Sequence, residues 1–282
     1  MTGLMRLRQR LAPTVAGRVL TWYRNLGLNE SDILLAGYPK SGNTWLKFLV
    51  GDVVLRTEID WDSALKFMPM MGWHRKAPRI LDGGGRLIST HDPFRQAYRR
   101  NKVIYIMRDG RDVAVSFYYH QLRLGRFEGT FQEFLPAFLA GRVTRLGSWH
   151  THVCRWVEWG REHPDKVLLV TYDTLKENPE FVLSEICRFL GVDVKSDEIR
   201  DAVKNNTFEK MREKEQKSVI MKKTSRKPIP FVREGKSGCW RDVFSQAQAA
   251  EFERVAGVAL ALVEDCTQGW RDLWAGSTWP RS

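Results

Sequence analysis

The sequence predicts a single α/β domain in which a mostly parallel sheet is flanked by helices. Short apolar runs rich in branched residues alternate with longer stretches of helical spacing, which is typical of parallel strands joined by crossover helices. The length of 282 residues suits one large domain with a sizeable core. With 43% hydrophobic and 28% charged residues, the composition excludes global disorder, collagen and a coiled coil.

Four apolar runs predict the strands, because each is short and bounded by polar or turn residues: 33–37, 87–90, 103–107 and 167–171. Six further stretches have helical spacing: 44–55, 112–122, 131–139, 149–163, 180–190 and 246–262. Ligands of such a sheet bind at the carboxyl ends of its strands, so functional residues are expected in the loops that follow them. Residues 210–236 are basic, contain prolines and lack apolar periodicity, which is typical of a lid, a binding loop or a disordered segment.

The N-terminal segment, residues 1–30, contains five arginines before its first acidic residue, Glu30. Two interpretations stay open. A helix packed on the domain with a solvated arginine face is favoured, and the alternative is a basic helix in peripheral contact with an anionic membrane. The segment has too many arginines within its apolar stretch for a signal peptide. No apolar run in the sequence approaches the roughly 20 residues that span a bilayer. We therefore expect a soluble, cytoplasmic protein.

The charge balance indicates an anionic partner. There are 45 Lys and Arg against 33 Asp and Glu, a formal net charge of +12. This excess suits nucleic acid, a membrane surface or a phosphorylated or sulfated small molecule. The four cysteines form no C-x-x-C pair and the six histidines form no H-E-x-x-H pattern, so no metal site is expected.

A glycine-rich loop follows the first predicted strand and reads A-G-Y-P-K-S-G-N-T-W-L-K. Gly37 and Gly42 have the spacing of a P-loop, and a helix is expected to begin at Thr44, where backbone N–H groups would cradle an anion. The lysine of a Walker motif would stand directly after the second glycine, where this chain has Asn43; its lysine is Lys40. This difference opposes a P-loop nucleotide kinase or hydrolase, which remains the alternative among enzymes.

The whole octet Y-P-K-S-G-N-T-W resembles the phosphosulfate loop of the sulfotransferases that use 3′-phosphoadenosine 5′-phosphosulfate (PAPS). Four later segments resemble further elements of that family in the same order: V-I-Y-I-M-R-D-G-R-D-V-A-V-S, V-L-L-V-T-Y-D-T-L-K-E-N-P, N-T-F-E-K-M-R and F-V-R-E-G-K-S-G-C-W-R-D-V-F. The resemblance covers about residues 31–265. It implies a sulfotransferase domain there, with the basic helical segment 1–30 before it and a tail, 266–282, after it.

The resemblance also implies how PAPS is held. Lys40, Ser41, Gly42, Asn43 and Thr44 would bind the 5′-phosphosulfate. The 3′-phosphate would be held by Arg108, Ser116 and Arg233 together with Glu234 and Gly235. Glu234 stands where a basic residue is common in the family, so it could contribute only its backbone N–H. The residues expected at the adenosine are Trp45, Phe208, Phe231 and Tyr172, and for the first three plain packing is an equal alternative.

His91, in L-I-S-T-H-D-P-F, lies just past a predicted strand, where the family pattern K-T-H-[LF]-P has its catalytic histidine. The resemblance implies in-line transfer of a sulfuryl group to a hydroxyl or amine, with His91 as general base and Lys40 beside the leaving oxygen. Departures from the pattern are Ser89, Glu234 and Cys239. The acceptor would be a small molecule, sugar, lipid or peptide, and the product adenosine 3′,5′-bisphosphate. No nucleic-acid motif is found, although a basic nucleic-acid-binding protein remains an alternative; a homodimer is a further hypothesis.

Overall fold

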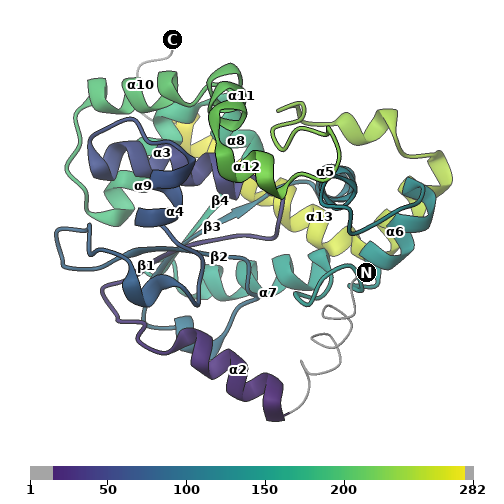
Figure 1. The fold of residues 1–282 in the computed structure, drawn as a ribbon, viewed down its shortest axis with the longest axis horizontal. Coiled ribbons are helices and arrows are strands. Elements are labelled where there is room, and N and C mark those ends of the chain that lie inside the picture. The colour runs from purple at the N-terminus through teal and green to yellow at the C-terminus, as the bar shows by residue number, and fades with distance from the viewer. Residues whose placement is uncertain (1–14, 277–282) are drawn as a thin grey trace.

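A computed structural model describes residues 15–276 of the chain. Its elements lie in this order: α2 (Val15–Asn25), β1 (Ile33–Ala36), α3 (Asn43–Leu55), α4 (Trp61–Phe67), η1 (His74–Lys76), β2 (Leu87–Thr90), η2 (Gln96–Tyr98), β3 (Lys102–Met107), α5 (Gly110–Arg123), α6 (Phe131–Leu139), α7 (Trp149–Glu162), β4 (Val167–Thr171), α8 (Tyr172–Glu177), α9 (Pro179–Leu190), α10 (Ser196–Asn205), α11 (Phe208–Lys217), α12 (Val219–Thr224), η3 (Cys239–Asp242) and α13 (Gln246–Ala275). Figure 1 shows helices on both sides of the sheet.

The four strands form one parallel sheet in the order β2-β1-β3-β4. The chain leaves β1 toward β2 on one side and then returns to β3 on the other side. The carboxyl end of β1 is therefore a topological switch point, where the loops after three neighbouring strands meet. The predicted fold class and all four predicted strands are confirmed, with shifts of one residue at β1 and β3.

Side chains alternate along the strands and supply two apolar cores, one on each face of the sheet. On β1, Leu34 and Ala36 join the core shared with α5, α6, α7 and α13. Ile33 and Leu35 join the core shared with α3, α4, α9 and α10. All residues of β1 and β2, and all but the first of β3, are buried, which explains why the strands appear in the sequence as nearly continuous apolar runs.

The last helix is longer than the sequence predicts. The prediction ends it at residue 262, but α13 continues to Ala275, so the expected boundary at residue 265 falls inside it. The extension is held by tertiary contacts: the Trp270 indole donates to Leu169 O at 2.7 Å, and the Thr267 hydroxyl lies 3.2 Å from that of Thr171. Apolar periodicity weakens after residue 262, so these contacts to β4 were not visible in the pattern.

The segment 210–236 is not a continuous loop. Its first part lies in α11 and α12, which begin at Thr207 and Ser218, each accepting a hydrogen bond from a backbone N–H three residues later. The prediction of an irregular segment is therefore wrong for residues 210–217 and 219–224. Residues 225–236 run irregularly across the carboxyl edge of the sheet.

Residues 1–14 lie outside the described range, so nothing tests the interpretation of Arg6, Arg8 and Arg10. Residues 15–25 form α2 at the lower edge of the view in Figure 1. Within residues 15–276, no helix combines the length and the apolar character that a membrane span requires.

Candidate active site

One cavity of about 380 Å³ opens at the carboxyl edge of the sheet. It collects every site residue predicted from the sequence except Ser41. Those that line it are Lys40, Gly42, Asn43, Thr44, Trp45, His91, Arg108, Ser116, Tyr172, Phe208, Phe231, Arg233, Glu234 and Gly235. Ser41 is fully buried, and its N–H donates to Tyr38 O at 3.2 Å. The structure therefore places Ser41 behind the loop rather than in the cavity.

The loop between β1 and α3 has a backbone that only a few residues allow. Gly42 has a φ of 109°, and a Cβ there would lie 2.8 Å from the Tyr172 ring. Lys40 also has a positive φ, 72°, which is uncommon for a residue with a side chain. This backbone brings the amino end of α3 to the cavity, where its free N–H groups and dipole favour an anion.

The Lys40 side chain extends across the cavity toward Phe231. Its Nζ lies 3.5 Å from the centre of the Phe231 ring and 3.3 Å from Phe231 O. Burial, opposed by the attraction of Glu215 and aided by nearby arginines, lowers the pKa of Lys40 to about 7. An anion bound here would stabilise the charged form of Lys40.

His91 follows β2 and is held in one orientation. Its Nδ1 lies 2.7 Å from Gly37 O, so Nδ1 carries the proton and Nε2 keeps its lone pair. Burial lowers the pKa of His91, and the charges of Lys47 and Lys40 lower it further, against the hydrogen bond to Gly37. The imidazole is therefore neutral at pH 7, which a general base requires.

Arg108 follows β3 on another side of the cavity. Its guanidinium lies 4.3 Å from the centre of the Tyr172 ring, 3.4 Å from the Asp112 carboxylate and 2.5 Å from Lys236 O. Its buried Nε has no hydrogen-bond partner in the described part of the chain. A buried guanidinium with an unused N–H is suited to bind an anion.

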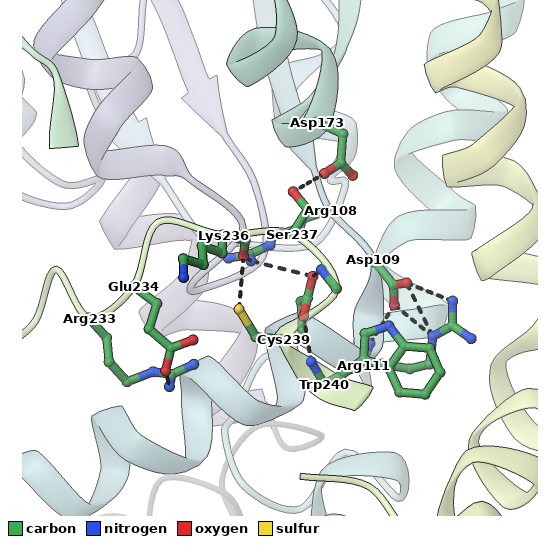
Figure 2. Close-up of polar contacts among 12 residues, drawn as sticks. Arg108, Asp109, Arg111, Asp173, Arg233, Glu234, Lys236, Ser237, Cys239 and Trp240 are labelled. Atoms are coloured by element: carbon green, nitrogen blue, oxygen red, sulfur yellow. Dashed lines mark hydrogen bonds and ion pairs between the residues drawn. The ribbon is translucent and has the colours of Figure 1, made fainter. Parts of the chain in front are cut away.

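Asp112, on α5, binds the backbone of the loop around residues 238–240. Its carboxylate accepts hydrogen bonds from Gly238 N at 2.7 Å and Trp240 N at 3.0 Å. The Asp112 side chain is buried. The Ser237 hydroxyl also donates to Asp173, so two carboxylates hold residues 237–240 beside Arg108 (Figure 2).

Arg233 and Glu234 form an ion pair at the mouth of the cavity (Figure 2). The Arg233 guanidinium also lies 4.6 Å from the centre of the Tyr119 ring, and its buried Nε has no partner within residues 15–276. Glu234 therefore uses part of the hydrogen-bonding capacity of the Arg233 guanidinium, which the resemblance assigns to the 3′-phosphate. This internal pairing is the structural consequence of having glutamate at position 234.

Replacing Glu234 with glutamine should strengthen the binding of adenosine 3′,5′-bisphosphate. The change removes a negative charge beside the expected phosphate and frees Arg233, so we expect an affinity about three- to tenfold higher. Isothermal titration calorimetry measures it. Glu253→Gln, at an exposed glutamate on α13, makes the same charge change and should leave the affinity unchanged. Weaker binding by Glu234→Gln would contradict the competition.

Phe231 is fixed by a carboxylate that the sequence analysis missed. Glu215, on α11, accepts hydrogen bonds from Phe231 N at 2.6 Å and Val232 N at 2.9 Å. The Phe231 ring packs edge-on against Trp61 and His120. Phe231 thus closes the cavity above Lys40, and Glu215 holds the irregular part of the segment 210–236 in place.

The other aromatic residues both pack and line the cavity. Trp45 donates from its indole N–H to Asn206 O at 2.8 Å and meets the Tyr172 ring at 5.8 Å between centroids. A Cβ on Gly235, whose φ is 63°, would lie 2.5 Å from the Phe208 ring. The choice between adenine contact and plain packing therefore stays a proposal.

His120 is a second histidine in the cavity, and the sequence analysis missed it. Burial, together with the charges of Lys40 and Arg123, lowers its pKa to about 2, so it is neutral. Its buried Nδ1 has no partner among the residues described. The signal was present: His120 stands four residues after Ser116 on α5, and i, i+4 residues share one face of a helix. Ser89, by contrast, donates its hydroxyl to Met68 O and does not line the cavity.

The parallel sheet has a glycine-rich loop at its switch point, and basic side chains from several elements meet in the cavity beside it. These features define an α/β group-transfer enzyme with an anionic donor. Residues 30–264 match the sequence profile described as the Sulfotransferase domain. The chain belongs to the sulfotransferase family, whose enzymes transfer sulfuryl groups. This membership decides against the P-loop kinase or hydrolase alternative.

The relatives agree along most of the chain. Sulfotransferase 1B1 of Mus musculus is 32% identical over 268 residues, which cover 86% of this chain and 88% of that protein. The crystal structure of mouse sulfotransferase SULT7A1 complexed with PAP has a TM-score of 0.67 and 25% identity, covering 88% of this chain and 94% of that one. Retinol dehydratase in complex with retinol and PAP has a TM-score of 0.69 at 21% identity, covering 84% of this chain and 83% of that one, and supports the fold.

Proposed function

We propose that this sulfotransferase moves a sulfuryl group from PAPS to a hydroxyl or amine by in-line displacement, with His91 as general base. The observation that carries the proposal is the shared cavity. It brings together the neutral His91, Lys40 and the anion-binding loop. The solved relative named above contains PAP, the desulfated product of that donor.

The residues present fit a donor with two anionic ends. The loop and the amino end of α3 suit the 5′-phosphosulfate. Arg108 and Arg233 each have a buried Nε without a partner within the described range, and these N–H groups suit the 3′-phosphate. Ser116 and the backbone N–H of Glu234 and Gly235 lie on the same cavity. PAPS supplies an activated sulfuryl group when bound, and the half-buried aromatic residues offer a slot for its adenine.

Two side chains then act on protons and charge. His91 Nε2 accepts the proton of the acceptor hydroxyl or amine, while Nδ1–H keeps its bond to Gly37 O and fixes the ring. Lys40 stabilises the negative charge that develops on the bridging phosphate oxygen. The charge on a sulfuryl group is smaller than that on a phosphoryl group, so the proposed mechanism uses no metal and the reaction should continue in a chelator. The acceptor is proposed to be a small molecule, sugar, lipid or peptide.

Incubation with PAPS and a panel of phenols, sterols, sugars, amines and peptides tests the proposal. Mass spectrometry should find an acceptor whose mass rises by one sulfuryl group, together with an equal amount of adenosine 3′,5′-bisphosphate. ATP with magnesium should not replace PAPS. Phosphoryl transfer from ATP, with none from PAPS, would overturn the proposal.

Arg108→Ala should weaken the binding of adenosine 3′,5′-bisphosphate by about 10- to 150-fold, because it removes a charged hydrogen-bond donor from the 3′-phosphate. Calorimetry with the bisphosphate and with adenosine 5′-monophosphate separates the ends of the ligand. The monophosphate lacks the 3′-phosphate, so its affinity should change much less. An unchanged dissociation constant for the bisphosphate would refute the role of Arg108.

The affinity for the bisphosphate should fall as the pH rises from 7 to 9. Lys40 has a pKa of about 7 in the free protein, and a bound anion raises it. Binding above pH 7 therefore takes up a proton, and the affinity falls by up to about tenfold per pH unit until the pKa of the bound state is reached. Lys40→Arg stays charged over this range and should flatten the profile. An equally steep profile in that variant would assign the proton to another group.

A further inference from the structure

The helix α2 exposes its apolar side and turns a polar side toward the domain. Four apolar residues of α2 recur at helical spacing and are exposed, namely Val19, Leu20, Trp22 and Tyr23, and Leu26, directly after the helix, is exposed as well. Trp22 keeps 64% of its surface exposed. A helix packed on a soluble domain normally has the opposite arrangement.

The polar side is anchored firmly. Arg24 donates to Asp92 Oδ1 at 3.2 Å and to Met71 O at 3.2 Å, and the Asp92 side chain is buried. On the neighbouring segment, Arg75 donates to Tyr23 O at 3.1 Å and places its guanidinium 4.4 Å from the centre of the Tyr23 ring. These contacts hold α2 in an orientation that leaves its apolar stripe outward.

The segment after Gly72 extends the exposed surface. A Cβ on Gly72 would lie 3.4 Å from the Arg24 side chain, so this segment runs beside α2. The next residue, Trp73, is 80% exposed. We call Val19, Leu20, Trp22, Tyr23, Leu26 and Trp73 the aromatic stripe. These exposed apolar residues lie on two neighbouring segments, and exposed apolar residues gathered in this way mark interaction sites.

The two sequence segments that carry the aromatic stripe are basic. Residues 1–29 contain five arginines and no acidic residue, and residues 63–81 contain four basic residues and no acidic one. Arg75, Lys76 and Arg79 are exposed beside Trp73. Two copies of the chain meeting through this surface would bring like charges together, which opposes self-association. The aliphatic members favour lipid over nucleic acid as the occupant.

We propose that the aromatic stripe binds the surface of an anionic lipid bilayer. Trp and Tyr are side chains of the membrane–water interface, aliphatic residues beside them enter the acyl boundary, and surrounding Lys and Arg attract anionic headgroups. The bilayer thus covers the outward face of α2 that the domain leaves bare. The proposal is independent of sulfuryl transfer, because the binding requires neither donor nor acceptor.

Sedimentation of the full chain with phosphatidylcholine vesicles, with and without phosphatidylserine, tests the proposal. Binding should require phosphatidylserine and weaken with salt. Trp22→Glu and Trp73→Glu should each weaken it at least about tenfold, since each puts a charge where an apolar ring enters the bilayer. The matched control is Leu273→Glu, at an exposed leucine on α13, which should bind like the wild type.

A second pair of variants tests the electrostatic contribution to vesicle binding. Lys76→Glu should weaken binding at least about fivefold, because each basic residue near an anionic surface contributes about 1 kcal/mol. Lys204→Glu, at an exposed lysine on α10, changes the net charge equally and should have little effect. An equal loss in both variants would indicate net charge rather than a site and would overturn the proposal.

Hydroxyl-radical footprinting identifies any other occupant. Trp22 and Trp73 should be oxidised in the free protein and protected by anionic vesicles only. Protection without vesicles would show that residues 1–14 or a second copy cover the stripe, and sedimentation velocity separates these two. Protection by oligonucleotides but not by vesicles would assign the surface to nucleic acid. Each of these results, or the absence of vesicle binding, would overturn the proposal.

Discussion

His91→Ala should lower the single-turnover rate of sulfuryl transfer by about 10²- to 10⁴-fold, a rise in the barrier of roughly 3 to 5 kcal/mol. The affinity for adenosine 3′,5′-bisphosphate should stay near the wild-type value, because the ring bonds to Gly37 O and is proposed to act on the acceptor proton. Rapid-quench measurement with an acceptor found by screening gives the rate. Calorimetry gives the affinity.

A structural histidine would behave differently. His152 offers the comparison: it is buried, its Nδ1 bonds to Tyr105 Oη, its Nε2 reaches the backbone of His91, and burial lowers its pKa to about 4. His152→Ala should lower the melting temperature and affect rate and affinity together. If His91→Ala keeps more than about a tenth of the wild-type rate, less than 1.4 kcal/mol remains for proton transfer, and the general-base role is contradicted.

Lys40→Met should lower the rate of transfer by about 10²- to 10³-fold, because it removes the charge proposed to stabilise the leaving oxygen. Methionine keeps a long unbranched side chain at the same φ of 72°, so the backbone strain stays the same in both proteins. The rate constant at saturating donor should fall more than the bisphosphate affinity, since the charge on the leaving oxygen grows only in the transition state.

The control for Lys40 is a second lysine with a lowered pKa. Lys47 lies one turn along α3 and does not line the cavity, and burial lowers its pKa to about 8. Lys47→Met should reduce the rate far less than Lys40→Met. A loss in Lys40→Met confined to donor affinity, with an unchanged rate at saturation, would assign Lys40 to binding alone.

Local patterns predicted the fold because its strands are buried on both faces and its principal loop has an unusual sequence. The alternation of apolar runs with stretches of helical spacing predicted the parallel sheet. A turn suited to an anion was predicted from the spacing of Gly37 and Gly42 and from a helix expected to begin at Thr44; the helix begins at Asn43. A strand end places its next residues at the sheet edge, and His91 and Arg108, which the resemblance assigned to the site, both line the cavity there.

Features that depend on contacts between distant segments were not predictable. Glu215 meets Phe231 N across sixteen residues, and Asp112 meets Gly238 N across 126. No periodicity or motif signals such a pair, because a carboxylate on a helix is usually solvated. The exposure of the aromatic stripe was not predictable either, because the sequence indicates an amphipathic helix but not which of its sides contacts the domain. Arg24 determines the side, through its bond to Asp92.

The binding of adenosine 3′,5′-bisphosphate, compared by calorimetry with that of adenosine 5′-monophosphate and ATP, tests the central claim most directly and needs no knowledge of the acceptor. The proposed site has separate cradles for the 3′-phosphate and the 5′ end. The bisphosphate should therefore bind at least about tenfold more tightly than either comparison ligand, since a phosphate held by charged hydrogen bonds contributes roughly 1.5 to 3 kcal/mol. Equal affinities for the three ligands, or a preference for ATP, would contradict the assignment of this cavity to PAPS.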